Sequence, residues 1–218
     1  MEEIVLDDPQ NGLYKHESDY GSGTQIVRID SFYDGEVTGI DKLKRVRLDD
    51  GTIQKYLLKE DNLLINRVNS RKFLGKSAIV PKLKEPTVFE SNMMRIAVNK
   101  KFVCPHYLVS LLQHQYVKTQ IDNKAKDAVN QSSINQDDVK SFELRIPPLE
   151  LQSTFKGTKR KIYGLLIRQN KAVEVENNLF NSLLQRAFEG GGNMAGFPVL
   201  PEGQIEALAS CEFRGQFT

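Results

Sequence analysis

Short apolar runs separated by turn residues fill roughly the first 148 positions of the chain. Runs of four to six aliphatic residues bounded by Gly, Asp and Asn are typical of strands. A hairpin is predicted over residues 45–56, because Asp50-Gly51 between two short runs favours a tight turn. A helix is predicted from Pro105 to Leu112, with proline in its first turn, and a short capped helix over 132–139. Strands are expected at 24–29, 63–68, 77–80, 93–98 and 142–146.

The pattern changes after Pro147-Pro148, where apolar residues recur at steps of three and four. This spacing places them on one face of a helix. About 40 residues at 1.5 Å each make a rod of roughly 60 Å, too long to bury its apolar face on the preceding domain alone. We therefore expect the helix to pair with a second chain, the alternative being a shorter helix that folds back on its own domain. The residues expected at this dimer interface are Phe155, Ile162, Leu165, Leu166, Val173, Leu179, Phe180 and Leu183.

These patterns predict an α+β chain in three parts. Residues 1–148 form one mixed α/β domain, and residues 149–190 form a long helix of the coiled-coil type. Gly190-Gly191-Gly192 ends the helical period, which leaves 191–218 as a tail of uncertain structure.

The composition is that of a water-soluble globular protein: of 218 residues, 39% are hydrophobic and 27% are charged. No run approaches the ~20 apolar residues that cross a bilayer. The acidic start, Met1-Glu2-Glu3, does not resemble a signal peptide, so a cytoplasmic location without membrane contact is expected. Cys104 and Cys211 are too far apart in sequence to suggest a disulfide framework.

A net charge of +2 conceals a strong asymmetry along the chain. Residues 1–41 contain ten acidic and two basic residues, whereas residues 42–84 contain twelve basic and four acidic residues. A local basic surface can bind phosphate groups even when the whole chain is nearly neutral. Double-stranded DNA is therefore a candidate ligand, unless solvated lysines and the early acids simply cancel one another.

The basic segment from Arg67 to Lys76 is the strongest candidate for a ligand-facing loop. Arg can read guanine, Asn can read adenine, and Lys holds phosphate. Replacing both Arg71 and Lys72 by Ala should weaken DNA binding and flatten its salt dependence by at most about two units of slope, one per lost phosphate contact. The full set of candidate DNA-binding residues is Lys44, Arg45, Arg47, Arg67, Asn69, Arg71, Lys72, Lys76 and Gln131.

Catalytic and metal-binding motifs are missing from the sequence. Gly75-Lys76-Ser77 ends like a P-loop, but Ser70 stands where the first glycine is required. The Cys and His residues lack the paired spacing of a zinc site. No catalytic residue, cofactor site or metal site is therefore expected, which favours a binding module over an enzyme such as a cryptic nuclease.

Several short segments, taken in order, resemble the specificity (S) subunit of type I restriction-modification systems. The resemblance covers about residues 10–190, and its most specific part is a Gln-Ser-Ser-Ile-Asn piece followed by Ile-Pro-Pro-Leu-Glu-Leu-Gln and a long helix. The segments are 20–30, 35–37, 63–67, 75–78, 105–108, 130–135, 146–152 and 183–190.

The resemblance implies that a target recognition domain reads one half-site in DNA and that a long helix sets the distance to a second half-site. It also implies a non-catalytic chain that anchors two methyltransferase (M) subunits and, through them, restriction (R) subunits. S-adenosylmethionine and ATP would then be bound by these partners. Because recognition is the variable part of such proteins, the resemblance assigns no base-reading residue.

The family normally carries two recognition domains and two long helices, and this chain has one of each. We therefore expect an antiparallel homodimer that reads an inverted, split site. Two alternatives remain open: a recognition module for an orphan or fused methyltransferase, and a helical scaffold that binds only protein.

Overall fold

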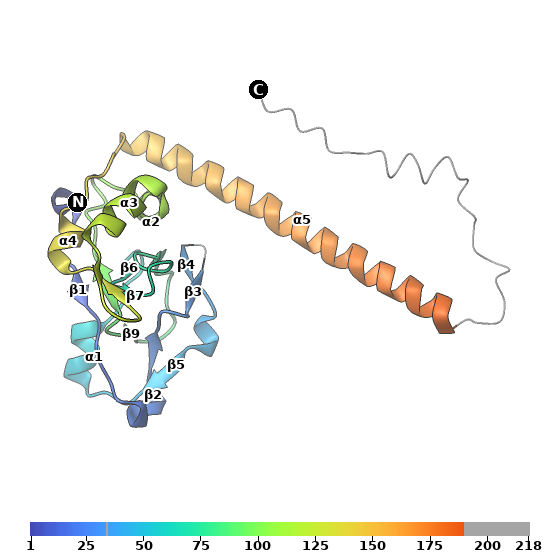
Figure 1. Ribbon diagram of the computed structural model, residues 1–218, viewed down its shortest axis with the longest axis horizontal. Helices are drawn as coiled ribbons and strands as arrows, with labels where there is room; N and C mark the ends of the chain where they lie inside the picture. The colour runs from blue at the N-terminus through green and yellow to red at the C-terminus, as the bar shows by residue number, and fades with distance from the viewer. Residues whose placement is uncertain (34, 190–218) are drawn as a thin grey trace. The chain divides into compact units, whose positions relative to one another are not determined.

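The computed structural model describes residues 1–33 and 35–189 (Figure 1). Residues Met1–Lys161 form one compact unit. A second unit begins at Ile162, inside the long helix α5 (Leu149–Glu189). The tail at 191–218 lies outside the described residues. Among the described helices, none is long and apolar enough to span a membrane.

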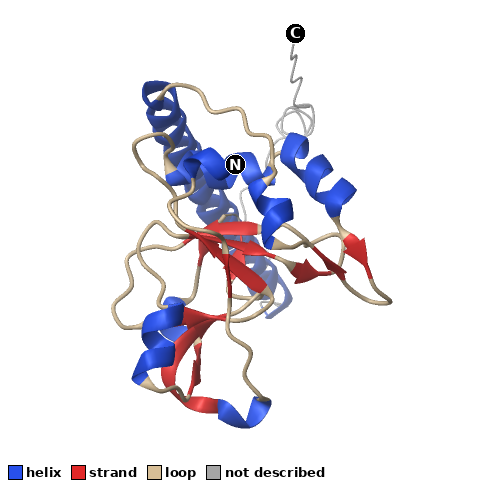
Figure 2. Ribbon diagram, turned by 90° about the vertical axis from the view of Figure 1, so that its left-hand side faces the viewer, coloured by secondary structure: helices blue, strands red, loops and turns tan. Residues whose placement is uncertain are grey.

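The compact unit contains three sheets, which are shown in red in Figure 2. The central sheet has the strand order β1-β10-β6-β8-β4-β3, with β4 parallel to β8 and the other neighbours antiparallel. The outer sheet, β5-β2-β9, pairs β2 parallel to β9, and the small sheet is β11-β12-β7. The strands are β1 Gln10–Asn11, β2 Tyr20–Val27, β3 Phe32–Tyr33, β4 Glu36–Val37, β5 Lys44–Val46, β6 Leu63–Asn66, β7 Val68–Asn69, β8 Ser77–Ile79, β9 Thr87–Phe89, β10 Met93–Ile96, β11 Lys126–Asp127 and β12 Ser132–Ser133.

The two faces of the central sheet bury different partners. Leu63 and Ile65 on β6 pack in one cluster with apolar residues of α2, α3 and α4, while Leu64 between them packs with β2, β3 and β9 on the other face. This alternation is the two-residue period of a strand. The helices of the unit before α5 are α1 Asp50–Tyr56, α2 Pro105–Gln113, α3 Gln115–Lys124 and α4 Gln136–Lys140, with 3-10 turns at Glu2–Ile4, Glu17–Asp19 and Ile40–Lys42.

The predicted α+β class, the strands β2, β6, β8 and β10, and the helix starting at Pro105 are confirmed. The predicted hairpin over 45–56 is wrong. Asp49 accepts a hydrogen bond from the Thr52 backbone N–H at 2.9 Å and so caps α1. Gly51 has no positive φ and does not form a turn.

Two further predictions near the end of the unit need correction. The strand expected over 142–146 does not form, because both backbone groups of Glu143 bond the Gln120 side chain at 2.9 Å. The helix predicted over 132–139 is shorter. Asn135 and Asp138 form a capping box at the start of α4, and Ser132 and Ser133 belong to β12.

The long helix is continuous from Leu149 to Glu189, so the alternative of a shorter helix is wrong. Gln152 fixes the first turn of this helix to the compact unit. Its side chain is fully buried, accepts from the Cys104 N–H at 2.7 Å, and donates to the carbonyls of Pro147 at 2.7 Å and Phe102 at 3.1 Å. The glutamine that ends the Ile-Pro-Pro-Leu-Glu-Leu-Gln piece is therefore a structural anchor.

Candidate nucleic-acid interface

The nine candidate DNA-binding residues fall into two groups on the fold. Lys44, Arg45 and Arg47 lie on and just after β5, at an edge of the outer sheet. Five of the other six belong to the segment between β6 and β8, called here the basic turn (residues 67–76), and the sixth, Gln131, directly precedes its neighbour strand β12. Asn69 of β7 pairs with Ser132, which places Gln131 beside the basic turn.

The basic turn is clamped onto α3. Arg71 donates two hydrogen bonds to Asp127, at 2.8 and 2.7 Å, and one to the carbonyl of Asp122 at 2.6 Å. Lys118 donates to two carbonyls of the turn, those of Arg71 at 3.0 Å and Leu74 at 3.1 Å. This clamp gives the turn one fixed conformation, which a recognition surface requires.

Glycine is required at position 75, where the turn comes closest to α3. Gly75 has a φ of +76°, a conformation that side-chain-bearing residues rarely adopt. A Cβ there would lie 2.4 Å from the Ile121 Cδ1. The glycine therefore permits both the turn geometry and the close packing.

Two of the predicted arginines are already paired with carboxylates. The hydrogen bonds from Arg71 hold the pKa of the Asp127 carboxyl below its ordinary value. Arg45 does the same for the pKa of Glu85, to which it donates at 2.9 and 2.7 Å. Both pairs are exposed to solvent. A direct contact of either arginine with DNA stays a prediction.

The remaining candidates differ in how much of the side chain is available. Arg67 is half-buried and donates to the Ser91 carbonyl at 3.1 Å. Arg47 is exposed and donates to the Ser18 carbonyl at 3.1 Å. The amines of Lys72 and Lys76 lie 5.3 Å from the Phe73 ring and 4.8 Å from the Phe32 ring. Lys44 is exposed on β5.

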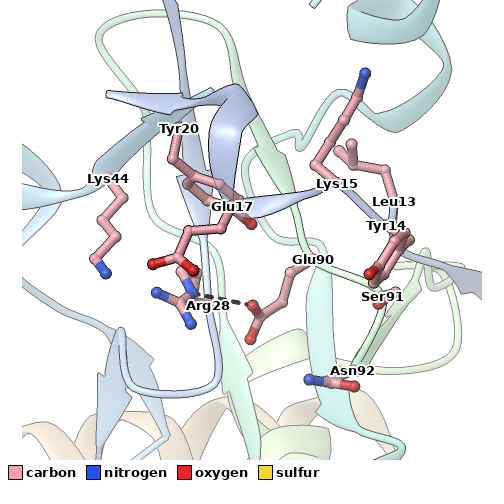
Figure 3. Close-up of a pocket in the computed structure, with 10 residues that line it drawn as sticks. All are labelled: Leu13, Tyr14, Lys15, Glu17, Tyr20, Arg28, Lys44, Glu90, Ser91 and Asn92. Atoms are coloured by element: carbon pink, nitrogen blue, oxygen red, sulfur yellow. Dashed lines mark hydrogen bonds and ion pairs between the residues drawn. The ribbon is translucent and has the colours of Figure 1, made fainter. Parts of the chain in front are cut away.

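A cleft of about 480 Å³ opens beside Lys44. Figure 3 shows its lining, with Arg28 and Glu90 facing each other at the centre and Asn92 on the opposite side from Lys44. Its residues are Leu13, Tyr14, Lys15, Glu17, Tyr20, Arg28, Lys44, Glu90, Ser91 and Asn92. Of these, sequence reasoning identified only Lys44. The rest come from an acid-rich stretch and from a turn more than sixty positions later, and only the Tyr14-Lys15 pair could have suggested a ligand surface.

The turn at Glu90–Asn92 links the cleft to the basic turn. The Asn92 carbonyl accepts from the backbone N–H groups of Arg67 at 2.9 Å and Val68 at 3.2 Å. Together with the bond from Arg67 to Ser91, these contacts tie one wall of the cleft to the start of the basic turn. The arrangement offers aromatic rings, amides and cations to one ligand, the mixture that protein–DNA interfaces use.

Among the described residues, no group of three His, Cys, Asp or Glu side chains could hold a metal ion.

Comparison with known proteins gives one family. A sequence model of the type I restriction modification DNA specificity domain matches residues 11–173. A putative type I restriction enzyme MjaX specificity subunit of Methanocaldococcus jannaschii is 31% identical over 189 residues, which cover 86% of this chain and 44% of that protein. The EcoKI specificity subunit of Escherichia coli K12 is 25% identical over 86% of this chain and 41% of its own length.

Solved structures agree on the fold. The HsdS subunit of Thermoanaerobacter tengcongensis superposes with a TM-score of 0.59 at 15% identity, over 92% of this chain and 50% of that one. The S subunit of the type I system of M. genitalium gives 0.53 at 13% identity, over 96% of this chain and 48% of that one. This chain thus spans about half the length of the relatives it matches. The resemblance seen in the sequence is confirmed, and the chain belongs to the family of type I restriction-modification DNA specificity domains.

Proposed function

We propose that this chain recognises one half-site of double-stranded DNA as the specificity subunit of a type I restriction-modification enzyme. The family match carries the proposal, because residues 11–173 include every cleft residue and all nine candidate DNA-binding residues. The cleft, the β5 cations and the basic turn form the proposed reading surface. Lys15, Lys44, Arg47 and Lys72 supply cations to phosphates, since none of them is ion-paired among the described residues.

The helix α5 supports a second part of the proposal, an antiparallel homodimer. Its large apolar side chains are exposed, with Leu165 at 63%, Phe180 at 61% and Leu183 at 46%. Residues 150–169 contain five basic and one acidic residue, whereas residues 170–189 contain two basic and three acidic residues. An antiparallel pair places the basic half of one helix beside the more acidic half of the other, and a parallel pair does not. Two copies would supply the two recognition domains that the family normally carries.

The partners follow from the same proposal. The dimer would anchor methyltransferase subunits and, through them, restriction subunits, and those partners would supply the S-adenosylmethionine and ATP chemistry. The chain itself would be non-catalytic. Its task is to choose the DNA sequence that the partners act on.

DNA binding is tested by fluorescence anisotropy of the full-length chain with labelled duplexes at several salt concentrations. The affinity should fall with salt, with a slope of about −0.9 per phosphate contact. Replacing Lys44 and Arg47 by Ala should flatten the slope by about two units. Lys101→Ala, in the loop that anchors α5, is the matched control and should leave the slope unchanged. A chain that shows no salt-dependent binding contradicts the proposal and favours a scaffold that binds only protein.

The homodimer is tested by light scattering at micromolar concentration, which should give twice the chain mass of 24.8 kDa. Replacing Leu165 and Leu179 by Lys should convert the dimer to a monomer. Lys at Asn178 and Asn181, which are exposed on the opposite face of the helix, should not. A wild-type mass of one chain would refute this part of the proposal.

A further inference from the structure

Arg28 lies at the centre of the cleft and is held there by a buried carboxylate. It follows the last residue of β2, and Glu90, 7% exposed, follows the last residue of β9 on the parallel neighbour strand. Glu90 accepts from the Ile29 N–H at 2.7 Å and from the Arg28 Nε at 3.1 Å. The Glu90 backbone is itself fixed, since its N–H donates to the Val27 carbonyl at 3.1 Å. The carboxylate therefore sets the direction of the guanidinium.

The guanidinium retains unused donors. Glu90 takes only the Nε–H, and neither Nη group of Arg28 has a hydrogen-bond partner among the described residues. Arg45 and Arg71 differ, because each directs its Nη groups to carboxylate or carbonyl oxygens of the protein. The Tyr20 ring lies 5.8 Å from the Arg28 Cζ and supports the guanidinium from one side. Arg28 thus presents a fixed pair of N–H donors to the cleft (Figure 3).

A neutral base edge fits these donors better than a phosphate does. Glu90 balances the charge of Arg28, and Glu17 also lines the cleft, so the centre carries little net positive charge. The amines of Lys15 and Lys44, which also line the cleft, are better suited to bind phosphates. Two N–H donors from one plane match the O6 and N7 acceptors of guanine in the major groove. Burial works against the charged guanidinium, but the hydrogen bond that Arg28 donates to Glu90, together with the negative charge of Glu90, raises the pKa of Arg28 above its ordinary value, so the donors remain protonated.

We infer that Arg28, positioned by Glu90, is a specificity-determining residue that reads a guanine through its two Nη groups. The inference rests on the proposed function and goes beyond it by naming one reading residue, its positioning partner and the base. Arg28 makes the base contact, and Glu90 acts through Arg28.

The test is selection of binding sites from a random duplex pool by the full-length chain. The wild type should enrich a motif that contains an invariant guanine, and Arg28→Lys should lose the preference at that position alone. Lysine keeps a charge for Glu90 but lacks the planar fork, so the fold and the salt dependence should persist. Lys44→Ala is the matched control from the same cleft, and it should weaken binding without changing the motif.

A base analogue locates the contact. With 7-deazaguanine in place of the invariant guanine, the wild type should bind roughly 10-fold more weakly, and Arg28→Lys should bind the two duplexes equally. Glu90→Gln should reduce the preference for guanine while leaving the salt slope unchanged, and Arg28→Lys should unfold within a few degrees of the wild type.

Other outcomes overturn the inference in distinguishable ways. If Arg28→Lys enriches the wild-type motif with its guanine intact, Arg28 does not read that base. If Arg28→Ala keeps the motif and flattens the salt slope by about one unit, Arg28 is a phosphate contact. If the wild type itself enriches no motif, the proposed function fails, and the inference fails with it.

Discussion

Replacing Gln152 should clearly weaken the attachment of the first turn of α5 to the rest of the compact unit. Its fully buried amide makes three hydrogen bonds, to Cys104, Phe102 and Pro147. Each such bond contributes about 1 kcal/mol net, and removing the side chain leaves three backbone groups without this partner. Gln152→Ala should therefore lower the free energy of unfolding by about 3 kcal/mol.

For a chain of this length, that loss corresponds to a fall of roughly 6–12 °C in the melting temperature. Thermal and urea unfolding followed by far-UV circular dichroism measure it. Ser153→Ala is the matched control, since the neighbouring serine is exposed, and it should change the stability by less than about 0.5 kcal/mol. If Gln152→Ala melts within 2 °C of Ser153→Ala, about the effect of less than 1 kcal/mol, the three bonds do not anchor the helix.

Three further predictions concern the basic turn, the α2 helix and the dimer. Because Asp127 already holds Arg71, replacing Arg71 and Lys72 by Ala should flatten the salt slope of DNA binding by only about one unit. Asp127→Ala frees Arg71 and removes a negative charge, so it should strengthen binding; weaker binding by Asp127→Ala would contradict this reasoning. Burial, and then the charge of Lys156, lower the pKa of His106, so the unfolded chain binds this proton more readily and the folded state loses stability as the pH drops below about 6.5. The melting temperature of His106→Gln should therefore fall less between neutral and acidic pH than that of the wild type. An equal fall in both proteins would exclude His106 as a cause of the acid destabilisation. Gln169 is the middle residue of α5. In an antiparallel pair that overlaps along the whole helix, Gln169 lies opposite its own copy, so Gln169→Leu should tighten the dimer measured by sedimentation, and dissociation would contradict this pairing.

The elements that could be predicted from the sequence are those governed by local pattern. The buried strand Leu63–Asn66 and the helix beginning at Pro105 follow from neighbouring residues alone. The segment Asp49-Asp50-Gly51 is compatible with two local structures, a tight turn and a helix cap. In the fold the Thr52 N–H donates to the Asp49 side chain, so the segment forms a helix cap. The segment 142–146 has a strand-like pattern, yet its backbone is satisfied by Gln120, more than twenty positions earlier.

The candidate site could be predicted only in part, because its pairings join distant positions. The count of basic residues identified Lys44 and the basic turn, but it could not show that Arg71 is held by Asp127, 56 positions later. Arg28 lies in the acid-rich stretch 1–41, so the count of basic residues does not identify it as a candidate DNA-binding residue. Its partner Glu90 is 62 positions away and reaches it through the parallel pairing of β2 with β9.

The most direct test of the central claim is to co-express the full-length chain with a type I methyltransferase subunit from the same system and to map methylated adenines by long-read sequencing. We predict a split, inverted-repeat motif that is absent when the methyltransferase is expressed alone, as expected if two copies of this chain each read one half-site. An asymmetric split motif would contradict the homodimer, because it requires a different second half. Methylation identical to that of the methyltransferase alone would contradict the specificity function itself.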